Sequence, residues 1–190
     1  YKYPQNAYPY DQIVATNRNC RRDEFEYELM DTGLFDKDQY FDVFVEYAKA
    51  TPEDILIEIT VSNRGPKPAT LHVLPTLWFR NTWSEGGARP SLKHVSLDEA
   101  AGVIEASQAD LGKRFFIAEG AKELLFTDND TNTMRLVGVP NQSPYVKDAF
   151  HNYVVLGHKD AVNPKKTGTK ASAYYLLTVG AGASKTLRLR

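Results

Sequence analysis

Long apolar runs are missing from this 190-residue chain. No stretch approaches the roughly 20 consecutive apolar residues that a membrane-spanning helix needs. The chain also lacks a basic run, because 23 Lys and Arg nearly balance 24 Asp and Glu. A protein that binds phosphate backbones carries a clustered positive surface. We therefore expect neither a nucleic acid nor a membrane as a partner.

Cysteine is almost absent. The single Cys20 has no partner for an internal disulfide, and the four histidines include no HxxxH or HxH pair. Without such spacing a zinc set cannot be assembled, so we expect no metal site, and nothing in the sequence implies a cofactor. A lone thiol slightly favours a cytoplasmic location, although an exported protein with one spare thiol fits as well, and the compartment stays open.

Motifs of several large enzyme classes are missing too. The sequence has no GxSxG elbow, no P-loop and no GxGxxG, which leaves acyl transfer and nucleotide chemistry without support. The acidic residues are scattered, and no pair stands out as a general acid and base. Residues 128–132 (DNDTN) lack the spacing of a calcium loop, and we interpret them as a solvated turn. We predict no catalytic residue in this chain.

What the chain does have is strand-like alternation. Residues 41–47 alternate apolar and acidic side chains, and at residues 55–61 isoleucine and valine occupy every second position. A period of two is typical of a half-buried strand. Residues 63–68 (NRGPKP) then form a turn, and residues 69–79 return with a second alternating run. We predict a hairpin whose far end carries both tryptophans.

Several short runs follow a glycine-rich loop at residues 86–90. The four strand-like runs are residues 92–97, which end at Leu97, and residues 102–106, 114–118 and 124–127. At the end of the chain, residues 173–179 and 185–190 resemble a closing hairpin across Gly180-Ala181-Gly182. Pro9, at a position where a first helical turn could begin, predicts a short helix at residues 11–17. Apolar spacing after the Ser143-Pro144 start signal predicts a second helix through residue 154. Short strands separated by turns predict an antiparallel β-sandwich with two short helices.

We expect residues 1–190 to form a single domain. The chain opens without an initiator methionine and closes in the middle of an alternating run. These features suggest that it is a piece of a longer, multidomain protein.

The best candidate for a recognition site is the aromatic tip after Phe79. It combines flat apolar faces with planar hydrogen-bond donors, as sugar-binding sites do, and comprises Trp78, Arg80, Asn81, Trp83 and Glu85. Strand ends that enter glycine loops often present binding residues. The alternative interpretation is that both tryptophans pack against the core or a neighbouring domain.

A second polar and aromatic cluster lies at residues 141–151. If these residues are helical, Lys147 and His151 lie on one face, four positions apart, with Asp148 beside them. This face could line a cleft shared with another domain. An ordinary exposed helix face is the other interpretation.

Five stretches carry a family resemblance: residues 1–5, 63–66, 74–83 (LPTLWFRNTW), 143–151 and 163–171. Together they resemble large bacterial glucosidase-like proteins, which are similar to glycoside hydrolase family 63, the processing α-glucosidase or mannosyl-oligosaccharide glucosidase family. The resemblance spans nearly the whole chain. It implies a β-sandwich of the galactose-mutarotase-like kind that accompanies an (α/α)6 barrel, and it places the catalytic acid and base of an inverting reaction on that barrel.

Three functions are therefore open. The first is a non-catalytic accessory domain that packs on the barrel of the same longer chain and lends a loop to its sugar pocket. The second is an autonomous carbohydrate-binding module that takes an oligosaccharide. The third is a mutarotase-type enzyme, which requires a histidine and a carboxylate that converge in a cleft, with His72 or His151 as the histidine.

Overall fold

The computed structural model describes residues 1–96 and 101–190. The fold is mainly β, with 41% strand and 17% helix, which confirms the predicted antiparallel β-sandwich with short helices. Within the described residues, every helix is too short or too polar to cross a bilayer. By its internal contacts the chain forms two compact units, which are described separately. That residues 1–190 form a single domain stays a prediction.

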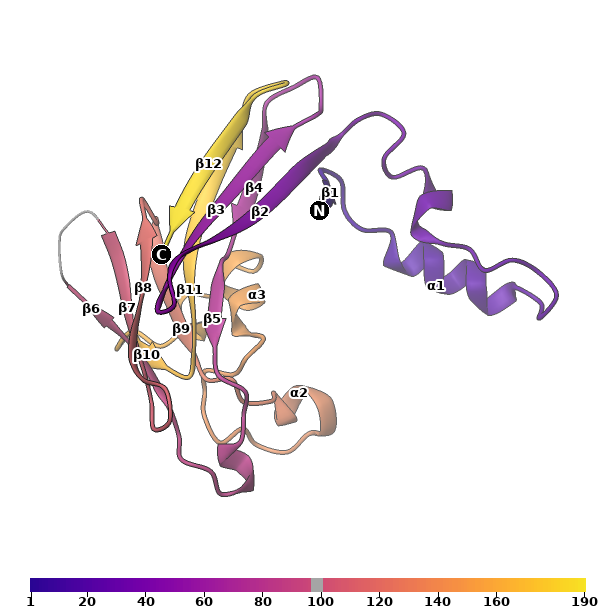
Figure 1. Ribbon diagram of the computed structural model, residues 1–190. Helices are drawn as coiled ribbons and strands as arrows, with labels where there is room; N and C mark the ends of the chain where they lie inside the picture. Colours follow the sequence, from indigo (N-terminus) through magenta and orange to yellow (C-terminus); the bar gives the residue numbers. More distant parts are fainter. Residues whose placement is uncertain (97–100) are drawn as a thin grey trace. The chain divides into compact units, whose positions relative to one another are not determined.

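The first unit comprises residues 1–48, 57–71 and 177–187. The larger sheet has the order β1-β2-β3-β12 here, and β4 pairs with β11 in a second sheet (Figure 1). The elements that contribute to this unit are β1 (Lys2–Pro4), α1 (Tyr10–Asn19), a 3-10 helix (Leu29–Thr32), β2 (Tyr40–Thr51), β3 (Asp54–Asn63), β4 (Ala69–Val73), β11 (Lys170–Val179) and β12 (Ser184–Leu189).

The predicted alternation of β3 is confirmed where it enters the core of this unit. Ile59 and Val61 are buried together with apolar side chains of β4, β11 and β12. On the opposite face, the Thr60 hydroxyl lies 3.2 Å from that of Thr186, and Ser62 and Ser184 are 2.7 Å apart. One face of the strand therefore contributes apolar area and the other contributes hydroxyl pairs to the neighbouring strand.

The predicted hairpin of residues 55–79 is wrong, because β3 and β4 belong to different sheets. Buried Asn63 explains the crossing. Its side-chain amide donates to the carbonyls of Lys67 (2.8 Å) and Val179 (3.0 Å), and its oxygen accepts from the Gly65 backbone N–H (2.8 Å). These bonds hold the 63–68 turn against the end of β11, so the chain changes sheets instead of folding back.

The predicted closing hairpin is wrong for a similar reason, since β11 and β12 also lie in different sheets. The Asn63 backbone N–H donates to the Ala183 carbonyl (2.9 Å), so one residue joins both crossings. The run at residues 69–79 is not one strand either. It breaks at Pro75, whose carbonyl accepts bonds from the backbone and the hydroxyl of β11 residues Ala173 and Ser172.

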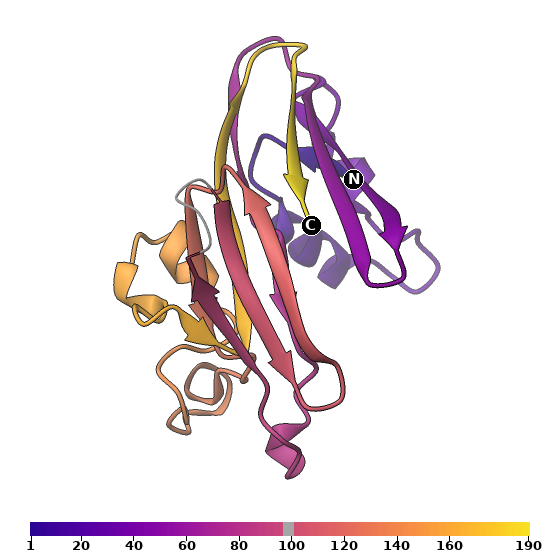
Figure 2. The same cartoon turned by 60° about the vertical axis from the view of Figure 1, so that its left-hand side comes forward.

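The second unit comprises residues 49–56, 72–176 and 188–190. One sheet has the order β8-β7-β6-β10, and Figure 2 shows β6, β7 and β8 side by side in magenta and pink. In the other sheet, β5 and β9 both pair with β11. The elements are β5 (Thr76–Trp78), a 3-10 helix (Trp83–Glu85), β6 (Ser91–Val95), β7 (Ala101–Gln108), β8 (Gly112–Glu119), β9 (Glu123–Thr127), α2 (Thr133–Val137), α3 (Ala149–Val154), a 3-10 helix (Lys159–Ala161) and β10 (Thr167–Gly168).

The four short runs predicted in this unit correspond to β6, β7, β8 and β9, although Leu97, at the end of the first run, lies outside the described residues. Helix α3 packs on β9 and β11 through one apolar cluster. The cluster joins Phe150 and Tyr153 of α3 to Leu125 of β9, Tyr174 of β11 and Val162.

The second predicted helix is shorter than expected, since it begins at Ala149 and not after Ser143. The preceding backbone makes other bonds: the Tyr145 carbonyl accepts from the Asp128 N–H (2.8 Å), and the Lys147 N–H donates to the Asp130 carbonyl (3.0 Å). The sequence analysis also missed α2, so two α-helices were expected and three are present among the described residues.

Candidate functional site

The loop that follows β5 is tied to a single carboxylate. Trp83 Nε1–H donates to Asp130 Oδ1 at 2.9 Å, and Asn81 Nδ2–H donates to the same oxygen at 3.1 Å. Asn81 Oδ1 in turn accepts from the Ser84 backbone N–H at 3.2 Å. The indole of Trp83 is half-buried, and its only polar group is already satisfied within the chain.

Arg89 completes the surroundings of this carboxylate. One guanidinium nitrogen lies 2.8 Å from Asp128 Oδ1 and 3.2 Å from Asp130 Oδ2, and the guanidinium carbon lies 5.4 Å from the Trp83 ring centroid. Burial lowers the pKa of Arg89, but the hydrogen bonds to both carboxylates outweigh it and the net pKa is raised. Arg89 therefore stays charged between the two carboxylates.

These carboxylates lie in residues 128–132, here called the Asp130 loop. The interpretation of this loop as a solvated turn is wrong, since only 14% of the Asp130 side chain is exposed. Asn129 anchors the loop, because its amide donates to the Phe79 carbonyl (2.9 Å) and its backbone N–H donates to the buried Thr169 hydroxyl (2.8 Å). The polar residues of the loop are used to join β5, β11 and the chain before α3.

The second predicted cluster meets the other side of the Asp130 loop. Asp148 accepts from Asn132 Nδ2 at 3.2 Å and from Arg135 at 3.0 Å, and Lys147 Nζ donates to the Thr131 hydroxyl at 3.1 Å. The Asp130 loop thus joins Asn81 and Trp83 of the first cluster to Lys147 and Asp148 of the second.

Lys170 lies beside this second cluster. Its ammonium donates to the Lys147 carbonyl at 2.6 Å and sits 4.9 Å from the Phe150 ring centroid. Burial is the main cause of its lowered pKa, and the nearby Lys147 adds to the effect while Asp148 opposes it.

Four of the eight predicted site residues are not gathered at the Asp130 loop. Trp78 on β5 is 57% exposed and lies opposite Lys170 in the sheet. Arg80 and Glu85 are exposed, and so is His151, whose ring has no hydrogen-bond partner within the described part of the chain. The expectation that Lys147 and His151 share a helix face is wrong, because Lys147 precedes the helix.

Two residues that organise this site, Arg89 and Asp130, were missed by the sequence analysis. The signal for them was present but general: a run rich in Asp and Asn favours side-chain to backbone bonds as well as solvation. Among the described residues, no group of three or more His, Cys, Asp and Glu side chains has the arrangement of a metal site.

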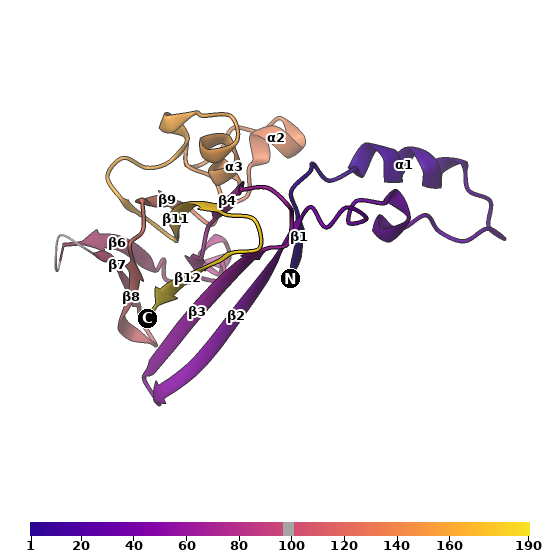
Figure 3. The ribbon, with the colours of Figure 1, turned by 90° about the horizontal axis from the view of Figure 1, so that it is seen from above.

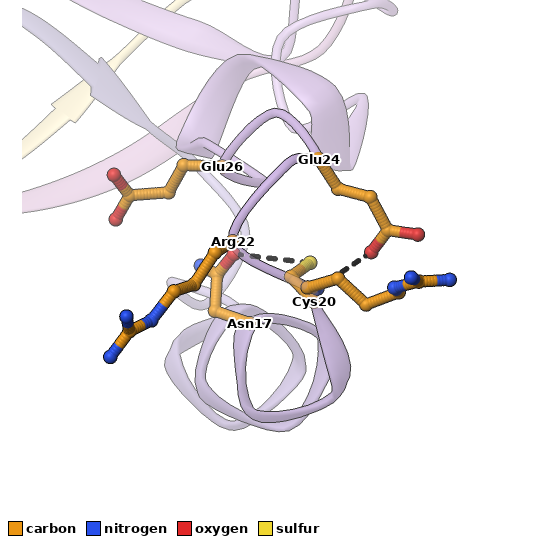
Figure 4. A pocket seen from close by; sticks show the side chains of 6 residues that line it. Asn17, Cys20, Arg22, Glu24 and Glu26 are labelled. Atoms are coloured by element: carbon orange, nitrogen blue, oxygen red, sulfur yellow. Dashed lines mark hydrogen bonds between the residues drawn. The ribbon is translucent and has the colours of Figure 1, made fainter.

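A small polar hollow lies in the first unit, near the end of α1. It has a volume of about 240 Å³, and Cys20 Sγ is 3.7 Å from Asn17 Oδ1 at its edge. Figure 4 shows the side chains of Arg22, Glu24 and Glu26 fanning outward from this hollow. Because these charged groups do not converge on one point, the hollow offers no ligand a shared set of contacts.

Comparison with known proteins gives one relative. No family model matches the chain, and no solved structure matches it. The chain is 34% identical, over an alignment of 227 residues, to an uncharacterized protein of Saccharomyces cerevisiae. The alignment covers all of this chain and 21% of the yeast protein, so the chain spans about a fifth of the length of the curated relative it matches.

Proposed function

We propose that this chain is a non-catalytic β-sandwich domain of a glycoside hydrolase related to family 63, and that it packs on an (α/α)6 catalytic barrel in the same longer protein. The resemblance at residues 74–83 and four other stretches supports the family. The yeast relative, about five times as long as the aligned part, supports a place within a larger chain.

The observation that carries the proposal is the apolar surface of α2. Four apolar side chains in and directly after this helix are more than half exposed: Met134, Leu136, Val137 and Val139. Exposed apolar side chains gathered in one short segment favour an interface, whereas an isolated sugar-binding module is expected to expose an aromatic platform in polar surroundings.

Hydrogen bonds hold these apolar side chains in solvent. Asn132 Oδ1 accepts from the Arg135 N–H at the start of α2, and Asn141 Oδ1 accepts from the Met134 N–H, each at 3.1 Å. Asn141 Nδ2 also donates to Asn132 Oδ1 at 3.1 Å. At the other end Gly138 has φ of 71°, which glycine adopts without strain. The helix is thus kept in place without burying its apolar residues, as a surface prepared for a partner would be.

The test uses Leu136→Asp in the isolated chain and in the longer parent protein. We expect no change in melting temperature for the isolated chain, because Leu136 is already in water. In the parent protein we expect a loss of roughly 1 to 3 kcal/mol of stability, since a charge would be buried at the interface with the barrel.

Leu111→Asp is the matched control, since Leu111 is similarly exposed in the turn between β7 and β8. The docking role is refuted if Leu136→Asp and Leu111→Asp behave alike in the parent protein. Hydrolysis of an α-glucoside by the isolated chain would show that the domain is itself catalytic.

A carbohydrate-binding module is the second candidate, and exposed Trp78 favours it. An indole face at the end of a strand can stack on a sugar ring. Calorimetry of the isolated chain with maltooligosaccharides tests this role. Binding that disappears in Trp78→Ala supports a module, and binding that survives this change excludes Trp78 as the platform.

The geometry gives less support to a mutarotase-type enzyme. His72 Nδ1 is 2.9 Å from the Tyr174 hydroxyl, and the two rings stack with an interplanar angle of 4°. Glu123, which lies opposite Tyr174 in the sheet, accepts a hydrogen bond from Tyr153 instead. The histidine and the carboxylate are thus each engaged with a tyrosine and not with each other.

A further inference from the structure

A pocket of about 390 Å³ lies in the second unit beside Arg89. Its lining comes from three places in the sequence: residues 89–91, Asp128 of the Asp130 loop, and the stretch from Asn163 to Thr169 that contains β10. The volume is at the small end of the range for pockets that hold small molecules. It suits one sugar-sized ligand and leaves little room for a larger one.

The charge at this pocket disfavours an anionic ligand. Arg89 is already paired with Asp128 and Asp130, so no uncompensated positive charge is offered to an anion. The same guanidinium lies against both carboxylates and offsets part of their attraction for a cation. A neutral ligand that accepts and donates hydrogen bonds is the class that disturbs this arrangement least.

The remaining hydrogen-bonding capacity alternates between donors and acceptors. Thr167 Oγ1 donates to the Leu92 carbonyl (3.1 Å) and keeps lone pairs to accept, whereas Thr169 is buried and its Oγ1 already accepts from the Asn129 N–H. Ser91 has no side-chain partner among the described residues, and Asp128 uses only one oxygen for Arg89. Adjacent donors and acceptors of this kind match neighbouring hydroxyl groups.

At the wall of the pocket formed by β10, the main chain at Gly168 lies very close to that of Thr127. A Cβ atom on Gly168 would lie 2.2 Å from the Thr127 carbonyl oxygen, so only glycine fits there. The Asn163 side-chain amide donates to the Thr167 carbonyl at 2.7 Å, and this bond holds the turn that leads into β10. Both features indicate that the pocket exists before any ligand arrives.

We infer that this pocket binds a neutral polyhydroxyl ligand of the size of one hexose unit, with Asp128 and Thr167 accepting hydrogen bonds from its hydroxyl groups and Arg89 and Ser91 donating to them. The site is separate from the exposed surface of α2, so it does not depend on the docking role. Trp78 is not among the residues that line it, so the two sites are tested by different substitutions.

The experiment titrates the isolated chain with maltose and with glucose and follows backbone amide shifts by NMR. We expect saturable shifts at millimolar sugar for residues 89–91 and 167–169. Asp128→Asn should weaken maltose binding by about 10-fold or more, because a charged acceptor becomes a neutral amide. Asp110→Asn, a matched change in an exposed turn, should leave binding unchanged.

A second variant keeps the test decisive if Asp128→Asn misfolds. Ser91→Phe fills the pocket from an exposed strand position and should abolish the shifts, whereas Ser96→Phe, just beyond the same strand, should not. The inference is overturned if maltose gives no saturable shifts at these residues, or if Ser91→Phe and Asp128→Asn bind as the unchanged chain does. If glucose 6-phosphate binds this pocket more tightly than glucose does, the inference that the ligand is neutral is overturned.

Discussion

Two helix-bearing segments of similar length behave in opposite ways. Residues 6–39, which carry α1, bury no side chain, and in Figure 3 this indigo segment extends away from β1 and β2 of its own unit. Residues 128–162 carry α2 and α3, and they bury five residues, among them Phe150 and Tyr153. Both contain aromatic and apolar side chains, so hydrophobicity alone does not explain the difference.

The difference lies in what the polar side chains do. In residues 6–39 they bond within the segment: Gln12 Nε2 donates to the Tyr27 hydroxyl (2.8 Å), and Asn17 accepts from the Tyr27 N–H and donates to its carbonyl (both 2.9 Å). In residues 128–162 they bond to loops outside the segment, through Asn129 and Asp130. In this chain α3 joins a core next to such anchors, whereas α1, whose polar side chains bond within their own segment, buries nothing.

The largest expected effect separates two phenylalanines. Phe150→Ala should destabilise the chain by about 3 to 5 kcal/mol, because it leaves a cavity in the cluster of α3, β9 and β11. Phe25→Ala is the control, and it should change stability by less than about 0.5 kcal/mol, since Phe25 is 99% exposed. Urea unfolding measures both. Equal losses would show that residues 6–39 are part of a core after all.

The next effect concerns the anchor itself. Asp130→Ala removes the acceptor of Trp83 and Asn81 and one partner of Arg89, and we expect a loss of roughly 1 to 3 kcal/mol. In a Trp78→Phe background Trp83 is the only tryptophan, so its fluorescence should shift to the red as the indole enters water. Asp110→Ala should leave both the stability and the emission maximum unchanged. A spectrum unaltered by Asp130→Ala would contradict the role of Asp130 as anchor.

The sequence predicted strands better than it predicted their partners. Alternation located β2, β3 and β6 to β9, because burial of one face follows from local spacing. Strand pairing depends on contacts between distant residues, and here the bonds of Asn63 to Lys67, Val179 and Ala183 redirect two turns between sheets. No local pattern distinguishes such an asparagine from one in an ordinary turn.

The same limit applies to the candidate site. Asn81, Trp83, Lys147 and Asp148 were singled out as polar and aromatic groups, but the Asp130 loop that joins them was assigned to solvent. An aspartate in a polar run is usually solvated. Only the fold reveals that Trp83, Asn81 and Arg89 converge on it. For α2, the sequence did contain the signals of a short helix: Asn132 is a typical N-cap residue, and Gly138 is a typical residue at a helix C-terminus.

A smaller effect tests the contact of α3 with β9. Tyr153 donates to Glu123, and burial, followed by this bond, raises the pKa of Tyr153 from 10.0 to about 12. A raised folded-state pKa gives stability that is complete below pH 10 and is lost as the pH rises toward 12. Tyr153→Phe should therefore cost about 1 kcal/mol at neutral pH, and its stability should fall less steeply than that of the unchanged chain above pH 10. Parallel pH profiles of urea unfolding would contradict this.

The smallest expected effect comes from the most disruptive local change. Ala15→Pro removes a backbone donor in the middle of α1 and clashes with the preceding turn, which costs about 3 kcal/mol in a helix that is coupled to the fold. Because residues 6–39 bury nothing, α1 should unfold locally without the rest of its unit. We expect a loss of helical circular dichroism and a change of less than about 0.5 kcal/mol in global unfolding. The matched change Asn152→Pro in α3 should destabilise the whole second unit. A global loss from Ala15→Pro as large as that from Asn152→Pro would mean that the two segments are equally integrated into their units, and the difference drawn here from burial would fail.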